Sequence, residues 1–336
     1  MGACDHLEGG RPSIILGKPG FQKTRLLSSG WFAVWLLGKG GKVVIRIRPR
    51  LEDHRYLRLF HIGAKHNWTA EEVDWSLPTG LDQRGALALS RLVSPIYLGE
   101  QSAMLGGARA LLAFAESGES NPQLYMASFI MDEARHLESI TRLYDLLGHD
   151  PIRIRELPEM LQYHHRMRLG ATPLHWAMGI LVSDIFARTF YGAFAKTKGS
   201  FLFGKLSTSI VVDEGRHQAF AEHYLSDHLP KADSGLRQEL FDVKEDLLRI
   251  VGKMGVKLRD DAEALGIESQ DIFGAFSEEV QERSHHVGLR CGPCPHATEH
   301  ATSGVDLSEQ CAGCFVTRTL EGIGLQADGP PERAGE

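Results

Sequence analysis

Two short motifs contain the residue types of a metal site. They are Asp132-Glu133-Ala134-Arg135-His136 and Asp213-Glu214-Gly215-Arg216-His217. Each contains Glu-x-x-His, and residues i and i+3 of a helix project from nearly the same face. One helix can therefore offer a carboxylate oxygen and an imidazole nitrogen to a single ion. One Glu-x-x-His arises by chance in many helices, but two copies of the longer Asp-Glu-x-Arg-His motif predict a metal site.

Both motifs lie in the middle of an apolar helical stripe. The first stripe is Phe129, Glu133, His136, Ile140, Leu143 and Leu147. The second is Leu206, Ile210, Glu214, His217, Ala221 and Tyr224. Burying a carboxylate costs several kcal/mol unless a partner satisfies it. Two such pairs facing one core predict a cation between them, and the alternative is a run of surface charges or of salt bridges between helices.

Two further acids complete the predicted site. A two-metal site in a four-helix bundle takes one more carboxylate from each of the other two helices. Glu100 lies 33 residues before Glu133, and Asp184 lies 30 residues before Glu214, each among apolar neighbours at helical spacing. For Glu100 the alternative is a buried pair with an arginine. The predicted ligands are Glu100, Glu133, His136, Asp184, Glu214 and His217.

A metal-bound histidine usually donates its outer N–H to an acceptor that fixes the ring. Asp132 and Asp213, beside the predicted ligands, are natural acceptors, with Arg135 and Arg216 as their partners. The alternative is that these aspartates and arginines form simple ion pairs at the protein surface. Small residues flank the predicted site and could leave a substrate cavity or allow close helix packing; they are Ala103, Gly106, Gly107, Gly179, Ser183 and Ala187.

The elements that must position these residues are helices. Apolar residues recur every three or four positions from about residue 81, which predicts helices at 81–117, 121–148, 154–168, 173–197, 201–228 and 234–262. Glycines and prolines separate these spans. Pro95 should kink or split the first helix, and Pro158 marks a possible start of the third. The sequence therefore predicts an all-α bundle over residues 61–285.

The two ends of the chain differ from this middle part. Residues 1–60 form a predicted basic extension, in which residues 1–50 carry nine Lys or Arg against Asp5 and Glu8, and Val43-Val44-Ile45 indicates a short strand. At the other end, residues 286–320 form a predicted Cys-rich appendix, and residues 321–336 a disordered tail.

The Cys-rich appendix has the spacing of a tetrahedral zinc site. Its cysteines are Cys291, Cys294, Cys311 and Cys314, with His296 and His300 as possible substitutes and Cys4 left over. Two Cys-x-x-Cys turns can close around one ion and order a weak segment. A rubredoxin-like iron centre that feeds electrons to the bundle, or a pair of redox thiols, are the alternatives.

Composition excludes several classes of protein. The 336 residues are 43% hydrophobic and 24% charged, as in globular proteins. The net charge of −6 argues against general nucleic-acid binding. No apolar run approaches the ~20 residues that span a bilayer. Five cysteines do not form a secreted disulfide framework in a chain of this length, so we expect a cytoplasmic protein.

These residues resemble the ferritin-like di-iron carboxylate proteins, and within them the ribonucleotide reductase small-subunit-like group. Di-iron N-oxygenases carry two copies of one pattern, in which a Glu is followed after about thirty residues by Asp-Glu-x-Arg-His. This chain is similar, with Asp184 in place of the second Glu. Trp68-Thr-Ala-Glu-Glu-Val-Asp74-Trp75 resembles a segment of reductase small subunits. In that family the tryptophan bonds the Asp beside the second motif's Glu, which implies a bond from Trp68 to Asp213.

Four positions depart from the patterns of these relatives. Ile140 stands where reductase small subunits carry a radical tyrosine, and Ile210 where N-oxygenases carry an extra histidine. Ligand-binding oxidases of this group join a valine to a tyrosine near the metals. In this chain, Ala103 and Gly179 fall near those two places.

The resemblance implies two iron ions, or one manganese and one iron, that react with O2. It favours an oxygenase or oxidase acting on a small organic substrate, by C–H hydroxylation or N-oxygenation, with electrons from a reductase or ferredoxin. The alternatives are a ribonucleotide reductase small subunit without the usual tyrosine and a non-catalytic ferritin-like iron-binding protein. The resemblance also implies a homodimer, because bundles of this group are commonly homodimers.

Overall fold

The computed structural model describes residues 33–38, 41–46, 51, 54–169, 172–199 and 201–289. The helices are α1 (Arg55–Lys65), α2 (Gln83–Ser117), α3 (Ser120–Leu147), α4 (Glu159–Arg168), α5 (Pro173–Thr197), α6 (Leu202–His228), α7 (Ser234–Lys257), α8 (Arg259–Ala264) and α9 (Ser269–His286). Strands β1 (Ala33–Gly38) and β2 (Gly41–Arg46) pair antiparallel, and β2 contains the predicted Val43-Val44-Ile45. The described body of the chain is helical, which confirms the predicted all-α, ferritin-like fold.

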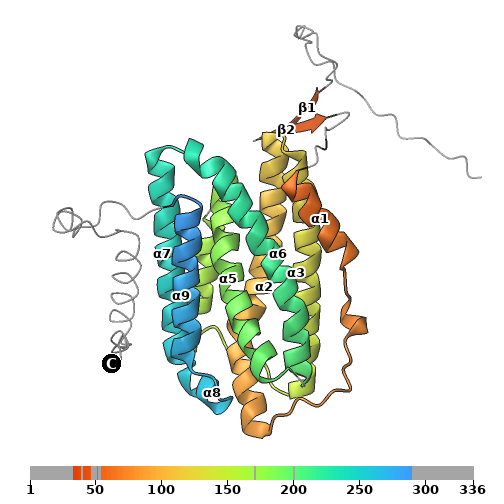
Figure 1. Cartoon of the computed structure of the whole chain (residues 1–336), viewed down its shortest axis with the longest axis vertical. Coiled ribbons are helices and arrows are strands. Elements are labelled where there is room, and N and C mark those ends of the chain that lie inside the picture. The colour runs from red at the N-terminus through yellow and green to blue at the C-terminus, as the bar shows by residue number, and fades with distance from the viewer. Residues whose placement is uncertain are drawn as a thin grey trace, which may run out of the picture.

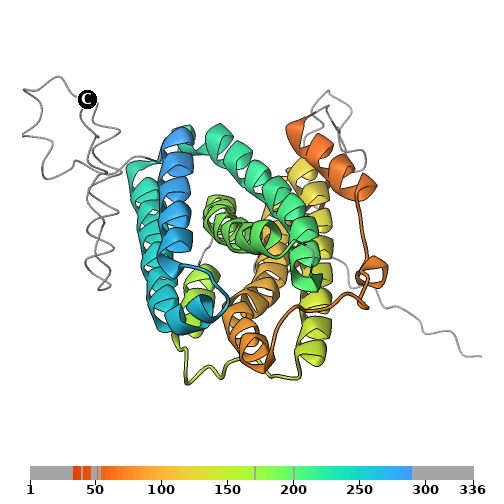
Figure 2. The ribbon, with the colours of Figure 1, turned by 60° about the horizontal axis from the view of Figure 1, so that its bottom comes forward.

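Four long helices, α2, α3, α5 and α6, form the centre of the bundle (Figure 1). Seen nearer to end-on, α5 lies in the middle, with α2, α3 and α6 on one side and α7 and α9 on the other (Figure 2). The helices that carry the two motifs, α3 and α6, therefore face the helices that carry Glu100 and Asp184. This arrangement is the one that a four-helix metal site requires.

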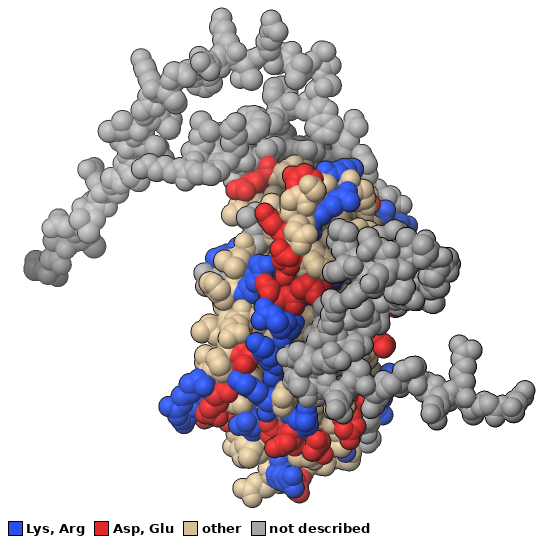
Figure 3. Space-filling model, turned by 90° about the vertical axis from the view of Figure 1, so that its left-hand side faces the viewer, with Lys and Arg blue, Asp and Glu red and all other residues tan. Residues whose placement is uncertain are grey.

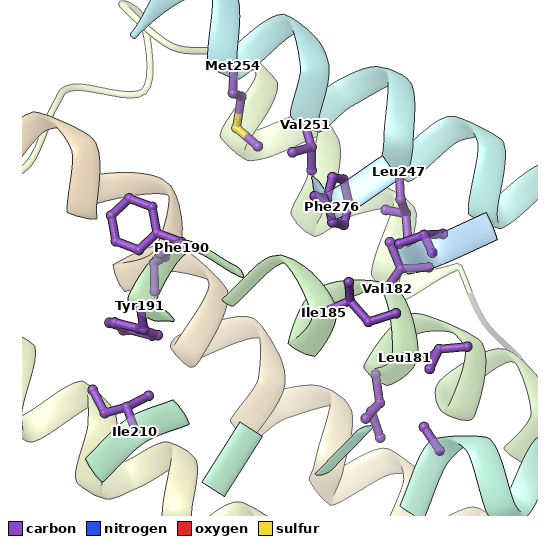
Figure 4. Close-up of a cluster of buried hydrophobic side chains, with 14 of the residues drawn as sticks. Leu181, Val182, Ile185, Phe190, Tyr191, Ile210, Leu247, Val251, Met254 and Phe276 are labelled. Carbon is purple, nitrogen blue, oxygen red and sulfur yellow. The ribbon is translucent and has the colours of Figure 1, made fainter. Parts of the chain in front are cut away.

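The composition of α5 explains its central place. Along its whole length it carries only three Lys, Arg, Asp or Glu residues, namely Asp184, Arg188 and Lys196. A helix that is apolar on all sides is stable only when neighbours cover every face. Figure 4 shows this burial, with Leu181, Val182, Ile185, Phe190 and Tyr191 of α5 in the same apolar cluster as residues of α6, α7 and α9.

Local signals set the ends of the central helices. The Asp82 side chain accepts a hydrogen bond of 2.7 Å from the Gly85 N–H and so caps the start of α2. Gly118 and Gly148 end α2 and α3 with φ angles of 75° and 68°. This left-handed conformation strains a residue with a Cβ but suits glycine. The predicted breaks at these two glycines are therefore present.

Some boundaries differ from the prediction. Helix α2 runs unbroken through Pro95, so the proline does not split it. The third helix begins at Glu159, after Pro158, rather than at 154. The predicted helix at 234–262 was wrong as one element, because α7 ends at Lys257 and α8 starts at Arg259.

Two helices were not predicted. Helix α9 has Phe273, Phe276 and Val280 at helical spacing and buried, which is the signal that could have revealed it. The other is α1, and the expected domain boundary at residue 60 falls inside it.

One face of the molecule carries charged side chains of both signs. On the face that lies at the left of Figure 1, Lys and Arg side chains are interspersed with Asp and Glu (Figure 3). Among the described helices, none combines the length and the apolar character needed to cross a membrane.

Candidate metal centre

The six predicted ligands converge in the centre of the bundle. Helix α2 supplies Glu100, α3 supplies Glu133 and His136, α5 supplies Asp184, and α6 supplies Glu214 and His217. Every one of these residues is at most 4% exposed. The structure thus brings together four carboxyl groups and two imidazoles drawn from positions 100 to 217 of the chain.

The ring atoms that face the cluster are the two Nδ1 nitrogens. Nδ1 of His136 lies 3.6 Å from Glu100 Oε2 and 3.5 Å from Glu214 Oε1. Nδ1 of His217 lies 3.2 Å from Glu133 Oε1 and 3.4 Å from Glu214 Oε2. The two imidazoles therefore share one carboxylate, Glu214, and each lies near a different oxygen of it.

The donor atoms form two overlapping groups that could each hold an ion. Glu100, Glu133, His136 and Glu214 offer one ligand atom each within 4.8 Å of one another, and Asp184, Glu214 and His217 do the same. Glu214 belongs to both groups, so it could contribute to holding either ion. Oxygen and imidazole ligands of this kind suit iron and manganese.

The hydrogen bonding of the cluster fits a cation. His136 Nδ1, His217 Nδ1 and Asp184 Oδ2 are buried and make no hydrogen bond. Buried polar atoms nearly always have a partner, because leaving one unpaired costs free energy. All three atoms belong to predicted ligands, and the two Nδ1 atoms face carboxylate oxygens of the cluster. A metal ion is the partner that would satisfy them.

The electrostatics point the same way. Burial raises the pKa of Asp184 well above its usual range, and the charge of Glu214 adds to this. Burial also raises the pKa of Glu133 strongly, with a further contribution from the charge of Glu100. Burial disfavours a charged His136, but the neighbouring carboxylates of Asp213 and Glu100 outweigh this effect and hold the pKa of His136 well above the ordinary value. Protons and a cation compete for these groups, so metal binding releases protons.

Behind the ligands, the two motifs are bonded crosswise. Nε2 of His136 on α3 lies 3.3 Å from Asp213 Oδ2 on α6, and Nε2 of His217 on α6 lies 3.1 Å from Asp132 Oδ2 on α3. Each histidine is thus oriented by the aspartate of the other motif. An N–H held at Nε2 leaves Nδ1 with its lone pair toward the cluster.

The two arginines tie the aspartates together. Arg135 Nη2 donates to Asp213 Oδ2 at 3.0 Å, and Arg216 Nη1 donates to Asp213 Oδ1 at 2.9 Å. Arg135 and Arg216 also both donate to Asp132. All four side chains are at most 6% exposed, so surface pairing, the alternative, does not describe them. The network fixes α3 and α6 relative to each other directly behind the candidate ligands.

Trp68 joins this network. Its Nε1 donates to Asp213 Oδ2 at 2.9 Å, which is the bond that the resemblance implied. The indole also lies under the guanidinium of Arg135, whose Cζ is 4.8 Å from the ring centre. A single oxygen, Asp213 Oδ2, therefore receives contacts from Trp68, Arg135 and His136.

One residue at the site was not assigned a role from the sequence. The hydroxyl of Tyr191 on α5 donates to Glu100 Oε1 at 3.1 Å, and Tyr191 is fully buried. It lies seven residues after Asp184, on the same face of the helix. That spacing makes Tyr191 one of the neighbours of Asp184 at helical spacing, but only the packing of α2 on α5 reveals the partner of its hydroxyl.

A cavity opens onto the carboxylates. Glu100, Glu133, Asp184 and Glu214 form part of its wall, and most of the other lining side chains are apolar. It contains about 810 Å³ of unfilled space, a figure that includes the part open to solvent. Of the small residues predicted to flank the site, those that line the cavity are Ala103, Gly106, Gly107, Ser183 and Ala187.

Gly179 is the exception among them. A Cβ at this position would come within 2.5 Å of the Met167 methyl carbon, so Met167 already fills the space over the glycine. Close packing, rather than an open void, explains this residue.

Several predictions concern residues that the structure does not describe. The predicted zinc ligands Cys291, Cys294, Cys311 and Cys314 lie outside the described residues, as do His296, His300, Cys4 and the tail at 321–336. The predicted basic extension is described only in part. These assignments stay predictions.

No protein-family model matches the sequence, and no curated protein matches it. Solved structures do match. A variant of R2-like ligand-binding oxidase with a Mn/Fe cofactor aligns with a TM-score of 0.60 at 16% identity, over 71% of this chain and 95% of that chain. A second variant, with an Fe/Fe cofactor, aligns with a TM-score of 0.59 at 17% identity over the same shares.

The fold is that of R2-like ligand-binding oxidase. A further variant of that oxidase, also with Mn/Fe, is 19% identical and has a TM-score of 0.58. The likeness covers nearly the whole of each R2-like chain and about seven tenths of this one.

Proposed function

We propose that this protein is an O2-dependent oxidase or oxygenase whose cofactor is two iron ions, or one manganese and one iron. The substrate is a small organic molecule, which is hydroxylated at a C–H bond or oxidised at nitrogen. The observation that carries the proposal is the lining of the cavity. The four carboxylates that could hold the ions also form part of the wall of a mostly apolar cavity. The cofactors of the R2-like structures support the choice of metals.

In the proposed site, Glu100, Glu133, His136 and Glu214 hold one ion, and Asp184, Glu214 and His217 hold the other. Two such ions, when bound and reduced by a reductase or ferredoxin, would supply electrons in pairs to O2 for the oxidation of a C–H or N–H bond.

The protein's own residues supply orientation and exclusion of water. Asp132 and Asp213 hold the Nε2 atoms of His217 and His136, so both Nδ1 atoms face the cluster. The hydroxyl of Tyr191 restrains the Glu100 carboxylate. Trp176, Phe129 and Met160 line the cavity and exclude water from the substrate.

Metal analysis of the full chain tests the proposal. Protein purified without chelator, and then loaded anaerobically with Fe(II), should contain two iron ions per chain or one iron and one manganese, and it should consume O2. Glu214→Ala should lose both ions, because Glu214 belongs to both ligand groups. Glu138→Ala on the same helix as Glu133 is the control, since Glu138 is half exposed and pairs only with Arg142. A chain that takes up no iron after anaerobic loading would refute the proposed function.

A further inference from the structure

Helix α4 forms part of the wall of the cavity that contains the candidate ligands. Met160, Tyr163 and Met167 of this helix line the cavity, and no residue of α4 belongs to either candidate ligand group. The helix therefore contributes a surface that a substrate can contact, and the polar groups on that surface bear on which substrate fits.

The hydroxyl groups of Tyr163 on α4 and Ser183 on α5 are hydrogen-bonded to each other in the cavity wall, with their oxygens 2.6 Å apart. Ser183 also donates to the carbonyl of Gly179 at 2.8 Å, four residues back on the same helix. A hydroxyl has one proton to donate and two lone pairs with which to accept. Because the Ser183 proton is already committed, Tyr163 is the donor between them. The phenol oxygen of Tyr163 therefore offers only lone pairs to a molecule in the cavity.

Ser102 on α2 shows the same arrangement with the next residue of α4. Its hydroxyl donates to the carbonyl of Leu98 at 2.9 Å and also contacts Nδ1 of His164. Since the Ser102 proton is committed to Leu98, the bond to His164 uses a proton on Nδ1 of the ring. Ser102 lines the cavity as well. Its oxygen, like that of Tyr163, is thus an acceptor toward the cavity.

We infer that Tyr163 and Ser183 bind the polar end of the substrate, and that this end is an alcohol or an amine that donates a hydrogen bond. The inference rests on the proposed function in taking the cavity as the substrate site. An O–H or N–H can pair with the lone pairs of these oxygens, whereas an ether, a ketone or a carboxylate would leave an acceptor facing an acceptor. Among the residues that the structure describes, no Lys, Arg or His lines the cavity, so a carboxylate lacks a cationic side chain there too.

Two variants of this pair should act in different ways. Tyr163→Phe removes the acceptor oxygen. Ser183→Ala instead frees the phenol proton, which turns Tyr163 into a donor toward the cavity. Tyr97→Phe is the matched control, because the Tyr97 hydroxyl lies 3.1 Å from that of Thr141 and Tyr97 does not line the cavity.

The test measures binding of 4-methylbenzyl alcohol, 4-methylanisole and 4-ethyltoluene to the metal-free full chain by calorimetry. These probes have the same number of non-hydrogen atoms, but the first can donate a hydrogen bond, the second can only accept one and the third can do neither. The wild type should prefer the alcohol to the ether. Tyr163→Phe should reduce this preference about threefold to tenfold, as expected for one net hydrogen bond.

Ser183→Ala should raise the affinity for 4-methylanisole relative to 4-ethyltoluene by a similar factor, because the freed phenol proton can be donated to the ether. Tyr97→Phe should change neither ratio. The inference is overturned if the wild type binds none of the probes or binds the alcohol no better than the ether. It is also overturned if Tyr163→Phe keeps the preference, if Ser183→Ala gains no affinity for the ether, or if Tyr97→Phe has the same effect as Tyr163→Phe.

Iron content, measured on the same wild-type protein after anaerobic loading, reports separately on the proposed function. A chain that takes up iron but does not prefer the alcohol would lose this inference alone. A chain that prefers the alcohol but takes up no iron would lose the proposed function, while the role of Tyr163 and Ser183 in binding a donor would stand.

Discussion

Nε2 of His217 on α6 lies 3.1 Å from Oδ2 of Asp132 on α3, so the histidine of one motif is oriented by the aspartate of the other. The reciprocal contact joins His136 to Asp213. Each motif is therefore incomplete alone, and the candidate ligands are correctly oriented only when α3 and α6 pack together. This relationship makes the metal site and the fold depend on each other.

Asp132→Asn should destabilise the protein strongly. Asp132 accepts hydrogen bonds from Arg135 and Arg216 and contacts His217, and all of these groups are buried. Removing one partner of a buried charge network costs about 3–5 kcal/mol, because the remaining charges are left uncompensated. Urea unfolding measures this loss. Glu138→Gln breaks a surface pair on the same helix and should cost about 0–1 kcal/mol; equal effects of the two changes would contradict the prediction.

Tyr191→Phe should alter the metal site while keeping the fold. It removes the hydroxyl that donates to Glu100 Oε1 at 3.1 Å, so the carboxylate is less restrained. The expected result is a changed absorption or electron paramagnetic resonance spectrum of the metal-loaded protein. The loss of stability should be about 1.5–3 kcal/mol, as for other hydrogen bonds to charged groups.

Tyr144→Phe is the matched control for Tyr191→Phe. The Tyr144 hydroxyl is also buried but donates to the Ser90 carbonyl, which belongs to neither candidate ligand group. Its spectrum should equal that of the wild type. Identical spectra for Tyr191→Phe and the wild type would remove the proposed role of Tyr191.

Metal affinity should fall as the pH falls. Burial lowers the pKa values of His136 and His217, but their surroundings hold both well above the ordinary value; these are carboxylates around His136, and Tyr125 and carboxylates around His217. Burial raises the pKa values of Glu133 and Asp184. Each group must be free of its ligating proton before it can bind a cation, so protons displace the metal at low pH. Calorimetric titration with Mn(II) at several pH values should show proton release, and an affinity independent of pH would oppose this account.

Removal of the metal should lower thermal stability. A ligand present at 100 times its dissociation constant stabilises the native state by about 2.7 kcal/mol if it does not bind the unfolded chain. Chelator should therefore lower the Tm of the wild type. It should leave the Tm of Glu214→Ala unchanged, because that variant lacks the shared ligand.

The cysteine motifs should bind zinc independently of the helical bundle. Cys291→Ser combined with Cys294→Ser removes half of the predicted ligands and should abolish zinc binding while iron content stays at the wild-type level. Element-specific analysis of both metals measures this. Loss of iron instead of zinc from the double variant would favour the rubredoxin-like alternative.

The sequence alone determined the central helices and the ligand candidates. Apolar periodicity and breakers such as Gly118 and Gly148 located the central helices, because these are local properties of the chain. The spacing of Glu133 and His136, and of Glu214 and His217, determined that each pair shares one helix face. Local periodicity did not reveal the break at Leu258. It also did not reveal helix α1, whose first residues fall within the predicted basic extension at residues 1–60.

Only the tertiary structure decided which groups meet. The crossed bonds of His136 with Asp213 and of His217 with Asp132 span 77 and 85 residues, and the bond from Tyr191 to Glu100 spans 91. No local pattern specifies such contacts, since they depend on the angle and register at which whole helices pack. The cavity beside α5 is likewise a space that remains after packing. Its shape depends on where side chains such as Met167 and Met254 lie, which spacing along the chain does not reveal.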